Sequence, residues 1–241
     1  MTGLLALLLL AASPEGQRVE WKVDGVAREA LVYVPAKKAE DGKPPLVVAF
    51  HGHGGSMRNA AEKFALHGHW PEAVVVYPQG LPTPGKLTDP EGKKAGWQHG
   101  AGEQGDRDLA FFDAVLASMK EKHGIDETRV YATGHSNGGG FTYLLWAMRG
   151  DVLAAIAPSG AAGSRALTRA KPLPVLHIAG EKDPLVTFAM QQRMFAAVKT
   201  LNGCEEKGKP WAEGCILYAS PKAPLVTFVH PGGHAYPDEA P

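Results

Sequence analysis

The sequence has no net charge, little cysteine and no hydrophobic stretch long enough to cross a membrane. Its 25 Lys and Arg residues balance 25 Asp and Glu residues, and no basic face is concentrated in the sequence, so we expect no nucleic acid partner. The apolar run over residues 4–12 is too short to span a bilayer, so we expect no stable membrane insertion. With 44% hydrophobic and 21% charged residues, the composition excludes a disordered or fibrous chain.

The same apolar run is typical of a secretory signal peptide, because small residues follow a hydrophobic segment of this length. We predict cleavage between residues 12 and 17, a signal peptide over residues 1–17 and a single domain over residues 18–241, in a secreted or periplasmic protein. The positively charged region that usually precedes such a run is missing, since no Lys or Arg precedes Arg18. An internal start site or a buried first strand is the alternative.

The only two cysteines, Cys204 and Cys215, close a short loop. An isolated pair at this spacing, in a chain with an expected export signal, predicts one disulfide. Closing a loop of this size stabilises a fold by about 3 kcal/mol in the chain-entropy model. Free buried thiols are the alternative if the protein stays in the cytosol.

Strand and helix patterns alternate along the chain. Apolar and alternating runs predict strands over residues 19–23, 30–34, 46–50, 73–77, 130–133, 152–157, 175–179, 216–219 and 225–229. Helical spacing predicts helices over residues 106–122, 141–148 and 186–201. This order predicts an α/β fold with a mainly parallel, doubly wound sheet, helices on both faces and two antiparallel strands at the N-terminus, joined at Asp24-Gly25.

Residues 130–140, VYATGHSNGGG, place a Gly-His-Ser-Asn-Gly pattern between a strand and a helix. In this context the serine sits in a nucleophile elbow, a turn so tight that side chains at Gly134 and Gly138 would collide with backbone. We predict that Ser136 is a nucleophile above the N-terminus of a helix, where the helix dipole favours developing negative charge. A plain glycine-rich turn is the alternative.

A serine nucleophile needs a base, and the base needs an acid that orients it. After such an elbow the acid comes first and the histidine second. His177, His230 and His234 follow Ser136. His177 lies in an apolar run and is expected in the core, so we predict that His234, in a flexible loop after the last strand, is the base. His230 is the alternative.

Two acidic residues follow the strand over residues 175–179. Asp183 and Glu181 are both candidates for the orienting acid, and position in the chain does not separate them. Asp183 precedes a proline before a helix, so its alternative role is that of a helix N-cap.

The glycine-rich loop over residues 51–55 follows the strand over residues 46–50. Glycines let the main chain approach a substrate closely, and an oxyanion hole takes one N–H from such a loop and one from the residue after the nucleophile. We therefore expect the N–H groups of His53 and Asn137 as donors, with Gly54 as the alternative to His53.

The His-x-His spacing of residues 51–53, repeated at residues 67–69, suggests metal binding. No further Asp or His signature completes such a site, so we expect no metal and no cofactor. The irregular stretch over residues 81–105 is long for a loop inside a compact domain, which favours a functional role. Trp97 in this stretch and Tyr236 are predicted walls of a substrate pocket, with packing under loops as the alternative.

Seven motifs follow one another in a specific order. They are His51-Gly52-x-Gly54-Gly55-Ser56, Tyr77-Pro78-Gln79-Gly80, Gly96-Trp97, Asp106-x-Asp108-x-x-Phe111, Gly134-x-Ser136-x-Gly138-Gly139, Gly180-x-x-Asp183-x-x-Val186 and Gly232-Gly233-His234-x-Tyr236-Pro237. With them the chain resembles the extracellular polyhydroxybutyrate depolymerase and feruloyl esterase group of α/β-hydrolases, close to carbohydrate esterase family 1. The resemblance covers about residues 21–237, and Tyr236 stands where the group often has Trp.

This resemblance implies an α/β-hydrolase fold with Ser136 as nucleophile, Asp183 as acid and His234 as base. It also implies oxyanion N–H groups on His53 and Asn137. We see no separate polymer-binding domain, which weighs against unaided attack on solid polyester.

We predict a secreted serine esterase that hydrolyses small or polymeric carboxylic esters through an acyl-enzyme, either of polyhydroxybutyrate type or feruloyl and acetyl esters of polysaccharides. A peptidase or an acyltransferase would use the same triad. A non-catalytic carbohydrate-binding protein on the same scaffold is the alternative from another class, and the intact Ser136, Asp183 and His234 argue against it.

Overall fold

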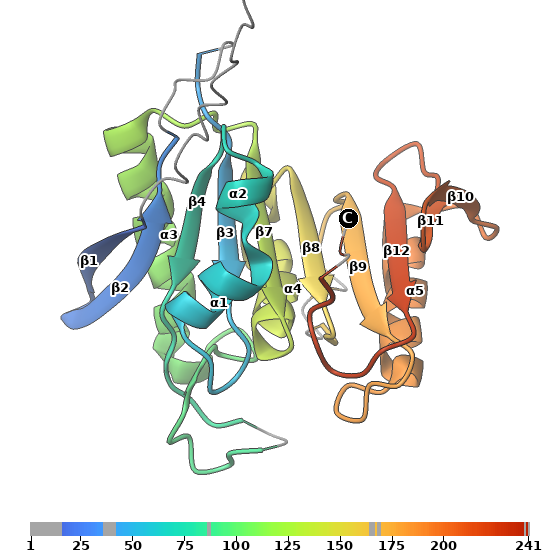
Figure 1. The fold of residues 1–241 in the computed structure, drawn as a ribbon, viewed down its shortest axis with the longest axis horizontal. Coiled ribbons are helices and arrows are strands. Elements are labelled where there is room, and N and C mark those ends of the chain that lie inside the picture. The colour runs from blue at the N-terminus through green and yellow to red at the C-terminus, as the bar shows by residue number, and fades with distance from the viewer. Residues whose placement is uncertain are drawn as a thin grey trace, which may run out of the picture.

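The computed structural model describes residues 16–35, 42–85, 88–163, 167, 170–238 and 240. In this part of the chain a ten-stranded sheet runs in the order β1-β2-β4-β3-β7-β8-β9-β12-β11-β10. Helices cover both faces of the sheet (Figure 1). The predicted α/β class with a doubly wound sheet is confirmed.

The centre of the sheet is parallel. Its strands, in spatial order, are β4 (Val74–Pro78), β3 (Leu46–Phe50), β7 (Val130–His135), β8 (Ala155–Ser159), β9 (Val175–Gly180) and β12 (Leu225–His230). All five residues of β3 and of β4 are buried, because helices cover both faces of these strands. Such strands carry continuous apolar runs rather than an alternating pattern, which is why the sequence identifies them well.

The N-terminal edge is the predicted antiparallel hairpin of β1 (Gln17–Val23) and β2 (Val26–Tyr33), and β2 pairs antiparallel with β4. Asp24 and Gly25 both have positive φ (49° and 82°), as a two-residue turn between twisted strands requires. Residues 1–15 of the predicted signal peptide lie outside the described residues. Gln17, the last residue of that segment, is the first residue of β1 and pairs with Val32.

The opposite edge is a second hairpin, formed by β10 (Lys209–Ala212) and β11 (Cys215–Tyr218), with β11 antiparallel to β12. All four residues of β10 are exposed, so this strand has no apolar pattern and the sequence does not predict it.

The helices α3 (Arg107–His123), α4 (Asn137–Arg149) and α5 (Phe188–Asn202) cover one face, and α1 (Met57–Phe64) and α2 (Leu66–His69) cover the other (Figure 1). The sequence does not predict α1, which begins directly after the glycine-rich loop. Ser56 caps it by accepting the N–H of Asn59 at 3.2 Å. Every helix among the described residues is too short or too polar to cross a bilayer.

The long connection between β4 and α3 is largely irregular, as predicted. It contains the short pair β5 (Leu81–Pro82) and β6 (Ala95–Gly96) and the 3-10 turn Glu103–Asp106. In Figure 1 it lies at the end of the molecule where β9 and β12 terminate, and the loop after β12 begins there. The carboxyl ends of the parallel strands therefore carry the long connections.

Candidate active site

Ser136 lies in the sharp turn between β7 and α4. Its backbone has φ 57° and ψ −119°, a conformation that an L-residue adopts only under strain. A Cβ on Gly134 would lie 2.6 Å from the carbonyl carbon of Gly138, and one on Gly138 would lie 2.6 Å from the carbonyl oxygen of His51. The local backbone thus requires glycine on both sides of the serine and presents Ser136 at the N-terminus of α4.

Ser136, His234 and Asp183 lie next to one another. The Ser136 Oγ is 2.8 Å from His234 Nε2, and His234 Nδ1 is 2.7 Å from Asp183 Oδ2. A carboxylate can only accept, so Nδ1 carries the proton and Nε2 is free to accept from the serine hydroxyl. The three residues come from the carboxyl ends of β7, β9 and β12, which makes a serine, a base and an orienting acid available in one place.

The Asp183 carboxylate is held by the loop that contains it. Its Oδ1 accepts the N–H groups of Leu185 and Val186 at 2.8 and 2.9 Å, and the residue is only 5% exposed. Asp183 is not the N-cap of α5, the alternative considered from the sequence, because that position is Thr187. One carboxylate oxygen of Asp183 binds the backbone of its own loop, and the other contacts His234. Glu181 is exposed and has no side-chain hydrogen bond among the described residues.

Behind Asp183 lies a buried chain of hydrogen bonds. The Gln191 amide donates to Asp183 Oδ2 at 3.3 Å and to the Val186 carbonyl at 2.8 Å. His177 Nε2 is 3.3 Å from Gln191 Oε1, and the Tyr143 hydroxyl is 2.5 Å from His177 Nδ1. Burial raises the pKa of Tyr143 and lowers the pKa of His177 to about 4, so the phenol donates to a neutral ring that in turn donates to Gln191. His177 is completely buried, as expected from its apolar run.

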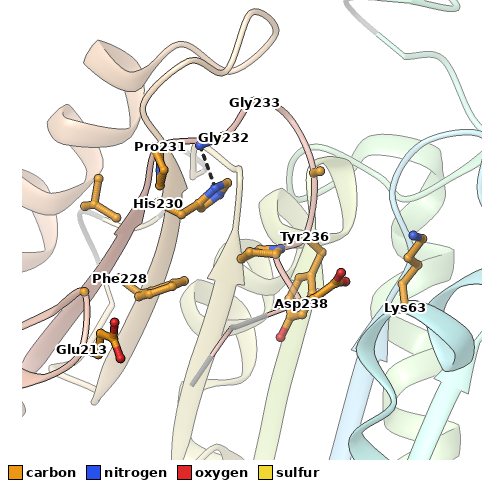
Figure 2. A pocket seen from close by; sticks show the side chains of 13 residues that line it. Lys63, Glu213, Phe228, His230, Pro231, Gly232, Gly233, Tyr236 and Asp238 are labelled. Carbon is orange, nitrogen blue, oxygen red and sulfur yellow. Dashed lines mark hydrogen bonds between the residues drawn. The ribbon is translucent and has the colours of Figure 1, made fainter.

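His230, the alternative base, has other partners than Ser136 among the described residues. Its Nδ1 accepts the N–H of Gly232 at 3.2 Å, and its ring stacks on Phe228 (Figure 2). It lines a cleft of about 730 Å³ on the outer side of the loop after β12, together with residues such as Glu213 and Tyr236. Ser136, Asp183 and His234 do not line this cleft.

His135, next to the serine, lies against the predicted base. Its ring centroid is 4.8 Å from that of His234, and its Nδ1 is 3.1 Å from the Ser159 hydroxyl. Burial, reinforced by the proximity of His234, lowers the pKa of His135 to about 4. The ring is therefore neutral at pH 7 and does not oppose a positive charge on His234. His135 was not among the residues predicted for the site, although its position directly before Ser136 in the elbow motif is a signal for it.

Near Ser136, the backbone N–H groups of His53 and Asn137 have no partner among the described residues. Asn137 is the first residue of α4, where an N–H has no acceptor within the helix. The N–H of Gly54, the alternative donor, is already bonded to the Ala95 carbonyl at 2.7 Å. The geometry thus leaves His53 and Asn137, rather than Gly54, free to bind a ligand.

A cavity of about 480 Å³ opens over Ser136 and His234. Its apolar wall consists of Ala162, Leu185, Val186 and Met190, and its polar lining includes Thr88 and His99. This volume is within the usual range for pockets that hold small molecules. The mixture of one apolar wall and a few polar groups suits a ligand with an apolar portion attached to a polar one.

Trp97 does not line this cavity. It is completely buried, packs against Phe50 and Phe141, and donates its indole N–H to the His51 carbonyl at 2.8 Å. The prediction of Trp97 as a pocket wall is therefore wrong, because the indole supports the floor of the site from below. Tyr236 packs on Phe64 and lines a neighbouring cavity of about 310 Å³ on the other side of His234.

The His-x-His pairs have other partners. His51 is buried; it donates Nδ1–H to the Gly52 carbonyl at 2.7 Å and accepts the Gly80 N–H at 2.9 Å. His53 Nε2 lies 3.2 Å from Asp89 Oδ2, and His67 stacks on Tyr33. Among the described residues, no three His, Cys, Asp or Glu side chains are grouped as metal ligands would be.

Both cysteines are free thiols, which contradicts the predicted disulfide. Cys215 packs with Ile178 and Phe228 on one face of the sheet, whereas Cys204 packs against the main core on the face covered by α5. The sheet separates the two sulfur atoms, so their proximity in sequence does not bring them within bonding distance.

Fold and geometry together are those of an α/β-hydrolase. A model of the Dienelactone hydrolase family matches residues 29–203, and the chain belongs to this family. The α/β-hydrolase esterase group, which the sequence motifs indicate, is confirmed by the relatives described next.

Curated relatives are esterases with low sequence identity to this chain. Feruloyl esterase D of Neurospora crassa is 28% identical over 197 residues, which cover 79% of this chain and 65% of the relative. A bifunctional acetylxylan esterase/xylanase of Neocallimastix patriciarum is 29% identical over 171 residues, which cover 68% of this chain and 22% of the relative. The chain thus spans less than two thirds of the length of these relatives.

Solved structures share the fold. An acetyl xylan esterase from Aspergillus awamori superposes with a TM-score of 0.67 at 15% identity, covering 93% of this chain and 96% of that chain. A CE1 ferulic acid esterase from Anaeromyces mucronatus, in complex with ferulic acid, gives a TM-score of 0.63 at 16% identity, covering 92% of this chain and 85% of that chain.

Proposed function

We propose that this protein is a serine esterase that hydrolyses carboxylic esters through an acyl-enzyme. The observation that supports this most directly is the continuous path of two hydrogen bonds from Ser136 Oγ through His234 to Asp183. Ser136 is the nucleophile, His234 the general base and then acid, and Asp183 the group that orients the imidazole and stabilises its charged form.

In the first half of the reaction, Ser136 Oγ forms a bond to the ester carbonyl carbon while its proton passes to His234 Nε2. The carbonyl oxygen becomes an oxyanion, which accepts hydrogen bonds from the N–H groups of His53 and Asn137. The carbon–oxygen bond to the alcohol then breaks, and the alcohol takes the proton from His234. Water attacks the acyl-enzyme in the same way, releases the acid and returns the proton to Ser136.

Neutral His135 supports the charged step. The imidazolium that forms on His234 faces Asp183 on one side and His135 on another, and the pKa of His135, lowered to about 4, keeps this second ring uncharged. Asp183 therefore attracts the positive charge on His234, and the neutral His135 ring does not repel it.

We propose feruloyl or acetyl esters of polysaccharides as the substrate class, with hydroxybutyryl esters as the second class. The names of the relatives support the first, and the apolar wall of Ala162, Leu185, Val186 and Met190 offers contact for the acyl group. A panel of acetyl, hydroxybutyryl and feruloyl esters will rank them by kcat/KM. Anilide substrates and alcohol acceptors in the same panel test for peptidase and acyltransferase activity.

The test of the mechanism is Ser136→Ala. We expect loss of p-nitrophenyl acetate hydrolysis, loss of labelling by a fluorophosphonate probe and an unchanged circular dichroism spectrum. In the wild type the probe should be found on the peptide that contains Ser136. Turnover by a folded Ser136→Ala protein would refute the mechanism.

We also propose that residues 1–17 direct export and that residues 18–241 form the mature catalytic domain. The support is the apolar run over residues 4–12 followed by small residues. Expression of the full chain in a Gram-negative host should yield periplasmic protein whose N-terminus begins between residues 13 and 18. Cytoplasmic protein that retains Met1 would contradict export.

A further inference from the structure

One segment of the long connection between β4 and α3 binds the side chains of both His53 and Asn137. These are the residues whose backbone N–H groups are free near Ser136. We call residues 88–97 the clamp segment. Asp89 in this segment contacts His53, and the backbone of Trp97 contacts Asn137. His53 and Asn137 are 84 residues apart in the chain, and among the described residues their side-chain hydrogen bonds all go to this segment.

The His53 ring is fixed on several sides. Its Nε2 lies 3.2 Å from Asp89 Oδ2, and the same oxygen accepts the Lys94 N–H at 2.8 Å. A Cβ on Gly85 would lie 2.8 Å from the ring, and one on Gly96 would lie 2.6 Å from Nδ1. Because neither glycine has a side chain, the imidazole fits between them. The ring thus occupies a slot formed by the backbone of Gly85 and Gly96.

The tautomer of His53 follows from its partner. Asp89 accepts, so Nε2 carries the proton, and Nδ1 is a buried acceptor without a partner among the described residues. Leaving a buried acceptor unpaired costs free energy. The ring keeps this position because the slot and the bond to Asp89 allow no other orientation.

Asn137 is held by two hydrogen bonds to one residue. Its Oδ1 accepts the Trp97 N–H at 2.7 Å, and its amide donates to the Trp97 carbonyl at 3.0 Å. Trp97 is itself completely buried and bonded to the His51 carbonyl. The Gly54 N–H, bonded to Ala95, attaches the glycine-rich loop to the same segment at a third point.

We propose that the clamp segment positions the oxyanion hole, with Asp89 and the side chain of Asn137 as positioning residues. The proposal rests on the proposed function, because it assigns the two N–H groups to an oxyanion. The segment orients His53 and Asn137 through their side chains and leaves both backbone donors free. Loss of an oxyanion donor costs about 10²–10³-fold in kcat, so a small displacement of either N–H should be measurable.

The test compares Asp89→Ala, Asp89→Asn and Asn137→Ala with the wild type on p-nitrophenyl acetate. Asp89→Ala removes the bond to His53, and we expect kcat to fall about 10–100-fold with KM within about twofold. Asp89→Asn retains an acceptor for both His53 and Lys94 and should recover most of the lost rate. Asn137→Ala keeps the backbone donor, removes both bonds to Trp97 and should lower kcat similarly.

Glu91→Ala is the matched control, since Glu91 lies in the same segment, is exposed and, within the part of the chain that the structure describes, forms an ion pair with Lys93 alone. We expect it to behave as wild type. The rate of fluorophosphonate labelling should fall with kcat in Asp89→Ala and Asn137→Ala, because phosphonylation also develops charge on an oxygen in this hole.

The outcomes separate the two proposals. If the wild type hydrolyses esters and folded Asp89→Ala and Asn137→Ala retain wild-type kcat, the clamp is refuted and the esterase mechanism stands. A change confined to KM, or failure of Asp89→Asn to recover any rate, also refutes the clamp. If Asp89→Ala does not fold, the kcat of Asn137→Ala alone tests the clamp: a lowered value supports it and a wild-type value refutes it. If the wild type does not hydrolyse esters at all, both proposals fail.

Discussion

Asp183 and His234 are separated by 51 residues in the chain and lie 2.7 Å apart at the ends of two paired parallel strands. The two oxygens of the carboxylate have different tasks. Oδ1 binds the N–H groups of its own loop, and Oδ2 binds the imidazole. The loop therefore sets the angle at which Oδ2 meets His234.

The first prediction concerns this pair. Asp183→Asn preserves the shape of the side chain, but its amide nitrogen can take the place of Oδ2 and donate to His234 Nδ1. That bond favours the tautomer with the proton on Nε2, which cannot accept from Ser136, so we expect kcat to fall about 10³–10⁴-fold. The control is Glu181→Gln, on an exposed neighbouring carboxylate, which should leave kcat unchanged. Equal losses in the two variants would contradict the assignment of the acid.

The second prediction compares two glycines of α4. Gly138→Ala places a Cβ 2.6 Å from the His51 carbonyl oxygen, where backbone cannot move aside, and should lower the free energy of unfolding by about 3 kcal/mol. Gly140→Ala meets its nearest neighbour, the Ala162 carbonyl oxygen, at 3.5 Å. Because alanine favours the helix, this variant should gain about 0.5–1 kcal/mol in urea unfolding. A reversed order would show that the turn is not as tight as described.

The third prediction concerns the buried ion pair between β2 and α3. Arg28 lies 2.8 Å from Asp108, and both side chains are almost completely buried. Arg28→Met leaves the carboxylate buried without its partner, so we expect a loss of about 3–5 kcal/mol in the free energy of unfolding. The exposed pair of Lys171 and Asp151 provides the control, because Lys171→Met should change stability by less than about 1 kcal/mol. Urea unfolding of both variants measures the difference.

The fourth prediction concerns acid sensitivity. Burial lowers the pKa of His177 from 6.5 to about 4, so the unfolded chain binds a proton between these values that the folded chain does not. The free energy of unfolding should therefore be undiminished above pH 6.5 and fall as the pH decreases towards 4, by at most about 1.4 kcal/mol per pH unit for this histidine. His135, whose pKa is lowered to about 4 mainly by burial, adds a slope of the same sign.

Urea unfolding between pH 7 and 4.5 measures this slope. His177→Gln should reduce it, whatever its effect on stability at pH 7, whereas His69→Gln, on an exposed histidine of α2, should not. An identical slope in wild type and His177→Gln would contradict the prediction.

The sequence predicts the parts of the site that depend on strand ends. Ser136, Asp183 and His234 each follow a strand with a clear apolar pattern, and parallel strands place their carboxyl ends together, so their proximity could be predicted. Position in the chain does not identify the acid, which only the resemblance to a known group of enzymes indicates. Asp183 and Glu181 are two residues apart in the same turn, and the path of that turn decides which side chain reaches His234.

Other features depend on the path of loops, and no local pattern encodes that path. The contact of Asp89 with His53 spans 36 residues and requires the whole connection after β4 to fold back over the glycine-rich loop. Trp97 is an aromatic residue in a long loop, a type that often lines a pocket. The path of the same connection decides that it is buried instead. For Cys204 and Cys215, short sequence separation suggested proximity, but Cys204 follows α5 and Cys215 lies in β11, and the two side chains pack on opposite faces of the sheet.

The wide separation of the triad in sequence also governs when activity can appear during refolding. Ser136 and His234 are 98 residues apart, so they meet only after β7, β8, β9 and β12 have paired. Helices such as α4 form from local contacts on a much faster timescale than parallel strands separated by long connections. During refolding, ester turnover should therefore recover later than the helical circular dichroism signal. Activity would then measure the late pairing of the parallel strands.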